Sequence, residues 1–298
     1  MDLSKDHHFN SCFWTANWNF DVLRALRSGV PLPGRSRDKI VYCWKLAPNK
    51  IVPLKTENCF VSKNANNVTV FHDQALEMIR QLAAEKKVVT NDVDEQSTGL
   101  VYSIENLFTD MEDLYRPTLL EVIRTGRIDD RKTKTMLCFF LFTQSLRNPT
   151  TWDYLKTSYT NADENEDEGM GVLKMFVDVH RSMETHEQVM NAIMPFLSVK
   201  WLLYKTDRFL FPLSDHALLM TAGKMIIPLA PDMLLEVLTK EPNSVDAPPC
   251  LYQLKLSYGK YRLFRQVTRM SAENELVFGA GRFFYRSFFD YHFRRRSQ

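Results

Sequence analysis

Five polar residues lie beside apolar or aromatic stretches, where a buried charge or hydrogen-bonding group is costly without a partner. They are His8, Glu112, Arg147, Asp215 and Asn274. Proton transfer, the positioning of a metal or a water molecule, and oxyanion stabilisation need an imidazole, carboxylates, a guanidinium and an amide. The residue types are therefore those of a hydrolytic or anion-binding site, provided that folding brings them together.

Three of these residues each have a structural alternative. His8 lies in the aromatic opening run His7 to Trp18, and is either a general acid/base or metal ligand, or a core histidine bonded to one backbone carbonyl. Glu112 borders the apolar face of a central helix and is either a site carboxylate or a solvated charge. Arg147 precedes Asn148-Pro149, and either caps a helix C-terminus or anchors a carboxylate or phosphate.

Asp215 and Asn274 allow two interpretations as well. Asp215 ends the apolar stretch Phe211 to Ser214, where a rigid strand can aim a carboxylate into a cleft, but an Asx turn closing the strand explains it equally well. Asn274 is expected on the last helix, either as an orienting residue near a site or as an exposed helix residue.

Composition favours one compact domain over residues 1–298. Of the 298 residues, 45% are hydrophobic and 25% charged, which is ordinary for a globular protein with a large core. The formal net charge of +2 produces no global field that would indicate a nucleic-acid or membrane partner. From Lys260 onward, however, nine Lys or Arg face three acids, and Arg294-Arg295-Arg296 is either a solvated tail or a nucleic-acid contact.

The cysteines and the chain start indicate a cytoplasmic protein. The five cysteines are scattered without a CxxC pair: Cys12, Cys43, Cys59, Cys138 and Cys250. Reduced thiols are expected, rather than a disulfide framework or a cysteine zinc site. The start carries neither the basic nor the apolar region of a secretory signal, and no apolar run approaches the roughly 20 residues that span a bilayer.

The pattern of elements predicts an α+β fold in three sub-regions. Residues 1–71 hold the opening segment and an antiparallel meander, with strands at 39–44, 50–54, 58–61 and 67–71. Residues 72–197 form a helical centre, with helices from Leu100 to Tyr115, from Pro117 to about Gly126, and over 131–146 and 172–197. The acidic segment 161–169 is expected to be a mobile loop.

Residues 198–298 are expected to hold antiparallel strands and a last helix. Strands at 199–204 and 208–213 form a hairpin, and another strand covers 224–229. Pro231 opens a short helix through Leu238, a Pro-rich linker covers 241–249, and the last helix ends around Gly279. The sequence contains no Gly-rich phosphate loop, GxSxG elbow, HExxH motif or kinase signature, so ordinary nucleotide-cofactor and zinc-protease functions are not expected.

These segments together resemble the bacterial family called domain of unknown function 4238. The first landmark of the resemblance is the opening pattern of His8, Phe9, Phe13, Trp14, Asn17 and Trp18. The others are Met111-Glu112, Arg147 with Pro149, Ser214-Asp215, Pro228-Leu229 with Pro231, and Asn274 followed by Ala280, Arg282 and Tyr285. The order and spacing of these landmarks cover nearly the whole chain.

The resemblance implies one site built from both ends and the middle of the chain. His8, Glu112, Arg147 and Asp215 would be its catalytic residues, with Glu112 and Asp215 as the ligands if a divalent metal is bound. Supporting or substrate-binding residues would be Asn17, Ser214, His216, Asn274 and Arg282. The chain departs from the family at Ser11, where proline is usual, and at His216-Ala217, where Asn-Pro is usual. His216 thereby adds a ligand or base of its own.

Three functions agree with these observations. The leading hypothesis is a nuclease-like hydrolase of a phosphate-containing substrate, such as nucleic acid or a nucleotide, acting as an effector in bacterial defence or stress. The second is a sensor module that binds an anion without turnover. The third is a protein-interaction subunit in which the polar cluster is a buried structural network and the basic C-terminus meets an acidic partner.

Overall fold

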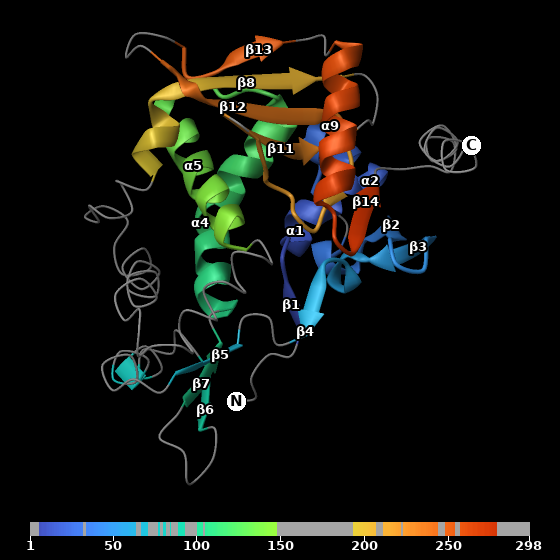
Figure 1. The fold of residues 1–298 in the computed structure, drawn as a ribbon, viewed down its shortest axis with the longest axis vertical. Coiled ribbons are helices and arrows are strands. Elements are labelled where there is room, and N and C mark those ends of the chain that lie inside the picture. Colours follow the sequence, from blue (N-terminus) through green and yellow to red (C-terminus); the bar gives the residue numbers. More distant parts are fainter. Residues whose placement is uncertain are drawn as a thin grey trace.

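The computed structural model describes residues 6–31, 34–63, 67–70, 77, 80, 81, 84, 89–92, 100–103, 105–147, 193–206, 211–221, 223–243, 248–253 and 257–278. Within them the protein has an α+β fold, with helices and mostly antiparallel sheets, as predicted (Figure 1). Several predictions fall outside the described residues, namely those on segment 161–169, most of 172–197, Pro149, Arg282 and Arg294–Arg296. Within the described part, no helix combines the length and the apolar character needed to cross a membrane.

The opening segment is packed deep inside the molecule. It forms β1 (Asp6–His8), α1 (Cys12–Thr15), η1 (Ala16–Trp18) and α2 (Phe20–Arg27), where η marks a 3-10 helix. The indole N–H of Trp14 donates to the Leu229 carbonyl at 3.1 Å, and that of Trp18 to the Phe211 carbonyl at 2.8 Å. Both indoles are buried, so this terminus packs against the C-terminal half of the chain.

Two long helices form the centre of the fold, α4 (Glu105–Thr125) and α5 (Arg131–Leu146). The prediction that Pro117 starts a new helix is wrong, because α4 runs straight through it. Proline normally breaks a helix interior, but this one is exposed, and the buried stripe continues on both sides of it through Tyr115 and Leu119. Gly126, at φ +67°, follows the last residue of α4, where a left-handed residue is favoured.

A five-stranded sheet lies between these helices and the last helix. Its strands follow the order β10 (Leu219–Thr221), β11 (Lys224–Ala230), β12 (Met233–Pro242), β8 (Val199–Lys205) and β13 (Leu251–Gln253). Only β13 runs parallel to its neighbour. Leu203 and Leu235 pack with α4 and α5, whereas Leu202 and Leu234 pack with Phe264 of α9 (Tyr258–Ser271). The sheet is therefore covered on both faces.

This sheet corrects two predictions. The run from Pro231 to Leu238 is the start of strand β12 and not a helix. β8 pairs with β12 and β13, so it forms no hairpin with the segment that ends at Leu213. A strand buried on both faces is apolar throughout and lacks the polar–apolar alternation that distinguishes it from a short buried helix.

A four-stranded sheet joins the two ends of the chain, in the order β3 (Lys50–Lys55), β2 (Ile40–Lys45), β14 (Glu275–Phe278) and β9 (Leu213–Ser214). The prediction that the last helix continues to Gly279 is wrong, because α9 ends at Ser271 and the chain then enters β14. Short apolar runs such as Leu276–Phe278 cannot be assigned by periodicity alone.

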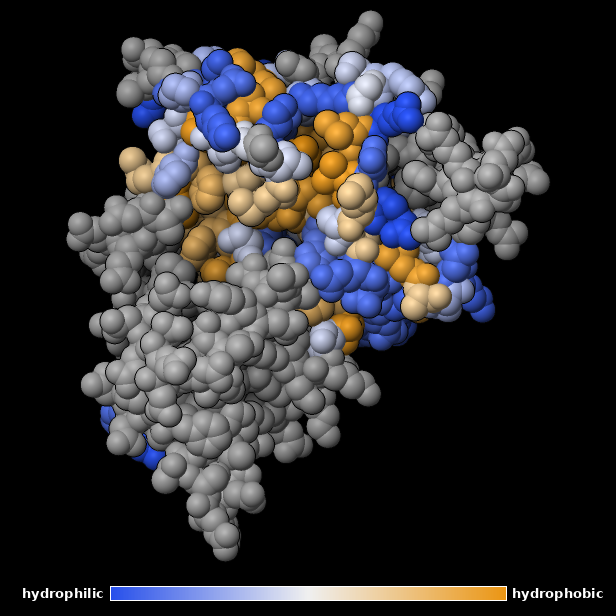
Figure 2. Space-filling model, viewed as in Figure 1, coloured by the Kyte–Doolittle hydropathy of each residue, from blue (hydrophilic) through white to orange (hydrophobic). Residues whose placement is uncertain are grey.

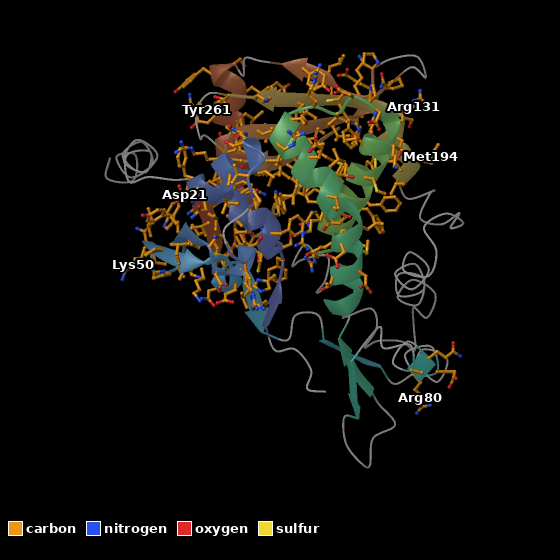
Figure 3. All side chains as sticks on the ribbon, turned by 180° about the vertical axis from the view of Figure 1, so that it is seen from behind. Asp21, Lys50, Arg80, Arg131, Met194 and Tyr261 are labelled. Carbon is orange, nitrogen blue, oxygen red and sulfur yellow. The ribbon has the colours of Figure 1, made fainter. Side chains whose placement is uncertain are left out.

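The remaining strands form two small sheets. β1 pairs with β4 (Val61–Lys63), and β5 (Asn67–Val70) and β6 (Val89–Asp92) flank β7 (Leu100–Ser103). Leu100 therefore begins a strand and not the first central helix. Two 3-10 turns, η2 (Ser36–Asp38) and η3 (Thr56–Asn58), lie against α1. From behind, the side chains of the N-terminal elements and of α4 fill the space between them (Figure 3).

Candidate functional site

Glu112 and Arg147 form a buried ion pair between α4 and α5. Arg147 directly follows α5, and its backbone N–H donates to the Thr143 carbonyl at 3.0 Å, so it also closes the helix. Its guanidinium lies 4.5 Å from the ring centre of Phe108 and donates to Oε1 of Glu112. The Arg147 side chain is only 3% exposed and that of Glu112 15%. The arginine thus holds an internal carboxylate, and Glu112 is the member of the pair that lies nearer to solvent.

His8 and Cys12 form a second pair in the opening segment. Nδ1 of His8 lies 3.4 Å from the carbonyl oxygen of Cys59, and Nε2 lies 3.9 Å from Sγ of Cys12. Because a carbonyl can only accept, we assign the proton of the neutral ring to Nδ1. Nε2 is then an acceptor that faces a thiol. An imidazole oriented through one nitrogen, with the other facing a proton donor, has the arrangement of a general base.

The thiol of Cys12 contacts His8 and also experiences the charges of Glu112 and Arg147. Burial raises the pKa of the Cys12 thiol to about 12, and the charge of Glu112 adds to this rise. The charges of Arg37 and Arg147 lower the pKa by a smaller amount. The thiol is therefore protonated at neutral pH and acts as a hydrogen-bond donor. Sequence reasoning counted Cys12 only as a reduced thiol, because a single cysteine in an aromatic run gives no sign of its partners.

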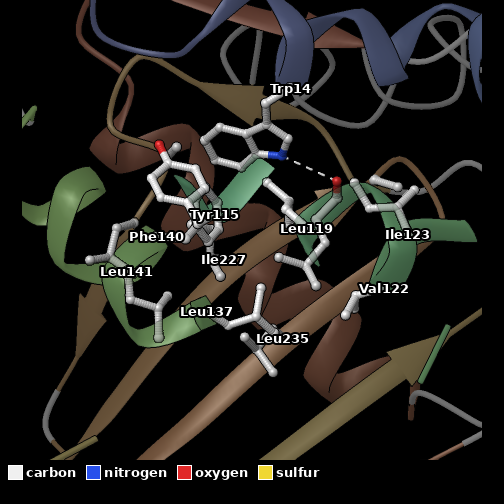
Figure 4. Packing of buried hydrophobic residues seen from close by; sticks show 14 of the residues in the cluster. Trp14, Tyr115, Leu119, Val122, Ile123, Leu137, Phe140, Leu141, Ile227 and Leu235 are labelled. Atoms are coloured by element: carbon white, nitrogen blue, oxygen red, sulfur yellow. Dashed lines mark hydrogen bonds between the residues drawn. The ribbon is translucent and has the colours of Figure 1, made fainter. Parts of the chain in front are cut away.

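Two buried polar groups lie next to the Glu112–Arg147 pair. The hydroxyl of Tyr115 and the side chain of Gln144 bond to each other at the α4–α5 interface; burial strongly raises the pKa of Tyr115, and the bond to Gln144 partly opposes this rise. Figure 4 shows Tyr115 packed beside Phe140 and near Trp14, whose dashed bond leads to the main chain. Sequence reasoning missed both, since a tyrosine and a glutamine on apolar helices resemble ordinary core and border residues. We call His8, Cys12, Glu112, Tyr115, Gln144 and Arg147 the Cys12 group.

Two exposed arginines lie near the Cys12 group. Arg37 lies on η2, which contacts α1, and Arg116 places its guanidinium 5.2 Å from the ring centre of Phe13. Their side chains are 58% and 46% exposed, and each pairs with a carboxylate, Glu57 at 3.1 Å and Asp113 at 3.0 Å respectively. Sequence reasoning missed these two cations as well, because solvated arginines are common and only the fold brings them to α1.

Asp215 has a different environment from the one predicted. Its carboxylate accepts the backbone N–H groups of Glu273 at 3.1 Å, Asn274 at 2.6 Å and Glu275 at 3.3 Å, and that of His216 at 3.2 Å. Burial raises the pKa of Asp215, and the N–H donors partly oppose this rise. The carboxylate therefore clamps the turn between α9 and β14 through distant backbone groups, which is neither the cleft position nor the local Asx turn that the sequence allowed. We call this arrangement the Asp215 clamp.

The residues named as supporting ones fall into structural roles. Ser214 donates its hydroxyl to the His216 carbonyl at 2.6 Å, and Nε2 of His216 lies 3.0 Å from Oε1 of Glu273. Asn17 donates to the Trp14 carbonyl at 3.0 Å and thereby closes α1. Asn274 is not on the last helix, as predicted, but in the exposed turn that follows it. It contributes its backbone N–H to the Asp215 clamp.

A further buried carboxylate, Glu275, connects the clamp to the strands of the N-terminal half. Oε2 accepts the backbone N–H of Phe60 at 2.7 Å and the thiol of Cys43 at 3.6 Å, and Oε1 pairs with Lys45. Phe60 has φ +57°, which is uncommon for a residue with a side chain and is fixed here by the bond to Glu275. This carboxylate too is fully occupied by the protein itself.

The structure thus brings three of the four predicted catalytic residues together, and places Asp215 in a separate network. Asn10 links the two networks, because its amide donates to the Ser214 carbonyl at 2.8 Å. Glu112 and Asp215 do not share a site, and the described residues include no group of three or more His, Cys, Asp or Glu side chains arranged to hold a metal ion. Comparisons with family models, curated proteins and solved structures found no match.

Proposed function

We propose that the protein is a hydrolase of a phosphate-containing substrate, with the Cys12 group and the two exposed arginines as its site. The observation that carries the proposal is the orientation of His8, whose Nδ1 is held by a carbonyl while Nε2 faces the thiol of Cys12. A half-buried imidazole held in this way can accept a proton from an attacking hydroxyl or water and return it to a leaving group.

The charged residues have distinct parts in this proposal. Arg37 and Arg116 are exposed cations beside α1, and their guanidiniums match the oxygens of a phosphate group. Arg147 is buried and bound to Glu112, so its part is to keep that carboxylate ionised and in place. Glu112 would orient the attacking water, with a divalent metal from solution as a partner if one is bound together with the substrate.

The direct test is hydrolysis of bis-p-nitrophenyl phosphate and p-nitrophenyl phosphate, with Mg²⁺ or with EDTA, by the full chain. Replacement of His8 by Gln should lower kcat about 100-fold or more, in line with the usual contribution of a general base. Replacement of Arg37 by Gln should mainly raise KM. Arg127→Gln is the matched control, because Arg127 is also exposed and paired with a carboxylate but lies just beyond the C-terminal end of α4, away from α1. Equal rates for all four proteins would contradict the proposal.

A second candidate, binding without turnover, is favoured by one observation. Arg147 and Asp215 are both occupied by partners from the protein itself, which is typical of residues that hold a fold. A sensor would bind the same anion through Arg37 and Arg116. It would show a phosphate-dependent rise in Tm, reduced in Arg37→Gln, together with no release of nitrophenolate at any protein concentration. The role of a defence or stress effector remains a prediction.

A further inference from the structure

Cys43 and Cys59 are two buried thiols that meet beside Glu275. Cys43 lies within β2, and Cys59 directly follows η3. Sγ of Cys43 lies 3.6 Å from Oε2 of Glu275. The same oxygen accepts the backbone N–H of Phe60, the residue after Cys59, at 2.7 Å. One carboxylate oxygen therefore holds the side chain of one cysteine beside the main chain of the other, and the two thiols bond to each other.

The surroundings of the two thiols favour an uncharged pair. Cys43 and Cys59 are 0% and 1% exposed and belong to the same hydrophobic cluster. The hydrogen bond with Cys59, burial and the charge of Glu275 all raise the pKa of the Cys43 thiol. A thiolate is therefore costly here, whereas a disulfide carries no charge and no hydrogen-bonding proton. Thiols that already contact each other also meet the main geometric condition for a disulfide, which is that the two side chains point toward each other.

We propose that Cys43 and Cys59 are a redox pair that forms a reversible disulfide between β2 and the segment joining η3 to β4. The oxidant is a small-molecule disulfide such as oxidised glutathione. One protein thiol attacks it, forms a mixed disulfide and releases one reduced glutathione. The second protein thiol then attacks the protein sulfur of that mixed disulfide and releases the other. The two protein thiols thus lose two electrons, and their two protons end on the two reduced glutathione molecules.

Burial decides the rate of this exchange. Figure 2 shows mostly hydrophilic side chains over the region of β2 and β4, and both thiols lie beneath the surface. The oxidant reaches them only when this part of the molecule opens locally, so the exchange takes minutes to hours. The disulfide then persists, because a reductant meets the same barrier.

The disulfide acts on His8 through Cys59. The carbonyl oxygen of Cys59 lies 3.4 Å from Nδ1 of His8, and the Cys59 thiol donates to the Lys55 carbonyl at 3.5 Å. A covalent bond draws Cys59 toward Cys43 and away from Lys55, and moves the carbonyl that orients the imidazole. Oxidation should therefore lower kcat about 10-fold, as displaced catalytic groups do. This effect on turnover rests on the proposed function, whereas the disulfide itself does not.

The test equilibrates the full chain with oxidised and reduced glutathione at several ratios. The samples are quenched with acid, and free thiols are then alkylated with iodoacetamide in urea. Trypsin cuts after Lys45 and Lys55, so Cys43 and Cys59 leave the chain in separate peptides. Mass spectrometry should find these two peptides joined by a disulfide in the oxidised samples. Dithiothreitol should restore both peptides in their alkylated form.

Matched variants separate this pair from general oxidation of thiols. Cys43→Ala and Cys59→Ala should each remove the linked peptides, whereas Cys138→Ala and Cys250→Ala, which change other buried cysteines, should keep them. The Tm of the oxidised wild type should exceed that of the reduced chain by roughly 4 °C or more, because the cross-link restricts the unfolded chain. The Tm of Cys43→Ala and of Cys59→Ala should not depend on the glutathione ratio, and this comparison holds even if either variant is less stable.

The outcomes separate the redox pair from its effect on turnover. Retention of both thiols at every ratio would overturn the inference, as would a link between Cys59 and Cys12, whose pKa also depends on Cys59. A lower Tm for the linked chain would overturn it too, because the native structure would have to distort to form the bond. If the link forms and both forms hydrolyse bis-p-nitrophenyl phosphate equally fast, the redox pair stands and its action on His8 is wrong. If neither form hydrolyses it, the proposed function fails, while the linked peptides still decide the redox pair.

Discussion

The Cys12 group and the Asp215 clamp contain similar residue types but use them differently. In the clamp, four backbone N–H groups surround one carboxylate, and every donor comes from the protein. In the Cys12 group, side chains pair with one another: Glu112 with Arg147, and Tyr115 with Gln144. A carboxylate that gathers backbone N–H groups fixes the course of the chain and so holds the fold, whereas a group of paired side chains leaves the backbone to its own helices.

Deletion of residues 1–18 should have the largest effect, because this segment supplies parts of both the Cys12 group and the core. It contains Trp14 and Trp18, which are 0% and 1% exposed. Loss of one buried Trp side chain costs about 3–5 kcal/mol, so loss of both approaches the total stability of an ordinary domain. Urea denaturation followed by circular dichroism should show no cooperative transition. A transition with unchanged midpoint would contradict the packing described above.

Replacement of Asp215 by Ala should unfold the turn between α9 and β14. Four backbone N–H groups would lose their acceptor, two of them buried and two partly buried; at about 1–3 kcal/mol for each buried group, a loss of about 2 kcal/mol or more is expected. Asp215→Asn keeps one acceptor oxygen and should cost roughly half as much. Urea denaturation measures both, with Asp113→Asn on the exposed face of α4 as the control.

The same variants distinguish the clamp from a catalytic residue. If Asp215→Ala keeps the midpoint of the wild type and loses only activity, Asp215 belongs to the site, as the sequence suggested. If activity falls only in proportion to the folded fraction, the clamp is structural. His8→Gln should give the opposite pattern, with folding kept and turnover lost.

Local signals explain which parts of the fold could be predicted. The helix from Arg131 to Leu146 follows from its apolar face and from the N-cap Asp130, whose side chain accepts the Thr133 N–H at 2.7 Å. β12 could not be assigned, because a strand buried on both faces has the same composition as a buried helix. Whether such a segment forms a strand or a helix depends on the segments that pair with it and pack on it, and these lie far away in the sequence.

The site was only partly predictable for the same reason. His8, Glu112 and Arg147 stood out as polar residues beside apolar stretches, and the fold places them around Cys12. Tyr115 and Gln144 bond to each other beside the Glu112–Arg147 pair, and that proximity exists only in three dimensions. Asp215 gave the same sequence signal as Glu112. Its backbone partners lie 58 to 60 residues away, in a turn that the sequence had placed inside a helix.

Glu236 is a third buried carboxylate, outside the Cys12 group and the Asp215 clamp, and it is paired with side chains of the protein. It is buried under α9, accepts the Tyr204 hydroxyl at 2.7 Å, and pairs with Lys260 at 2.5 Å and Lys224 at 3.2 Å. Burial alone would raise its pKa, but these donors together hold the pKa of Glu236 below its ordinary value of 4.5. The unfolded state therefore binds its proton first as the pH falls. Its contribution to stability is complete above about pH 4.5 and is lost as the pH falls through the folded pKa.

The Glu236→Gln variant should reveal that window. At pH 7 it should be less stable than the wild type by about 1–3 kcal/mol, since the lysines and Tyr204 lose a charged partner. The difference should shrink below pH 4, where the wild-type carboxylate is protonated as well. Free energies of unfolding from urea titrations between pH 3 and pH 8 measure this. A difference that stays constant over the whole range would show that Glu236 is not ionised in the folded protein.

The smallest effect comes from a matched pair of buried threonines. Thr15 in α1 and Thr143 in α5 are 1% and 0% exposed. The Thr143 hydroxyl donates to the Phe139 carbonyl at 2.8 Å, whereas Oγ1 of Thr15 has no partner within the described residues. Valine has nearly the same shape and lacks the hydroxyl. Thr15→Val should therefore raise the free energy of unfolding by about 1 kcal/mol, because an unpaired polar group is removed.

Thr143→Val should change stability in the opposite direction or leave it unchanged, since a satisfied hydrogen bond is lost. In a chain of this size, a change of about 1 kcal/mol shifts Tm by roughly 2 °C, which differential scanning calorimetry resolves when the two variants are measured together. If Thr15→Val is instead the less stable of the two, its hydroxyl has a bound partner in solution. Thr15 would then be a buried hydroxyl that a bound water or ligand completes in solution.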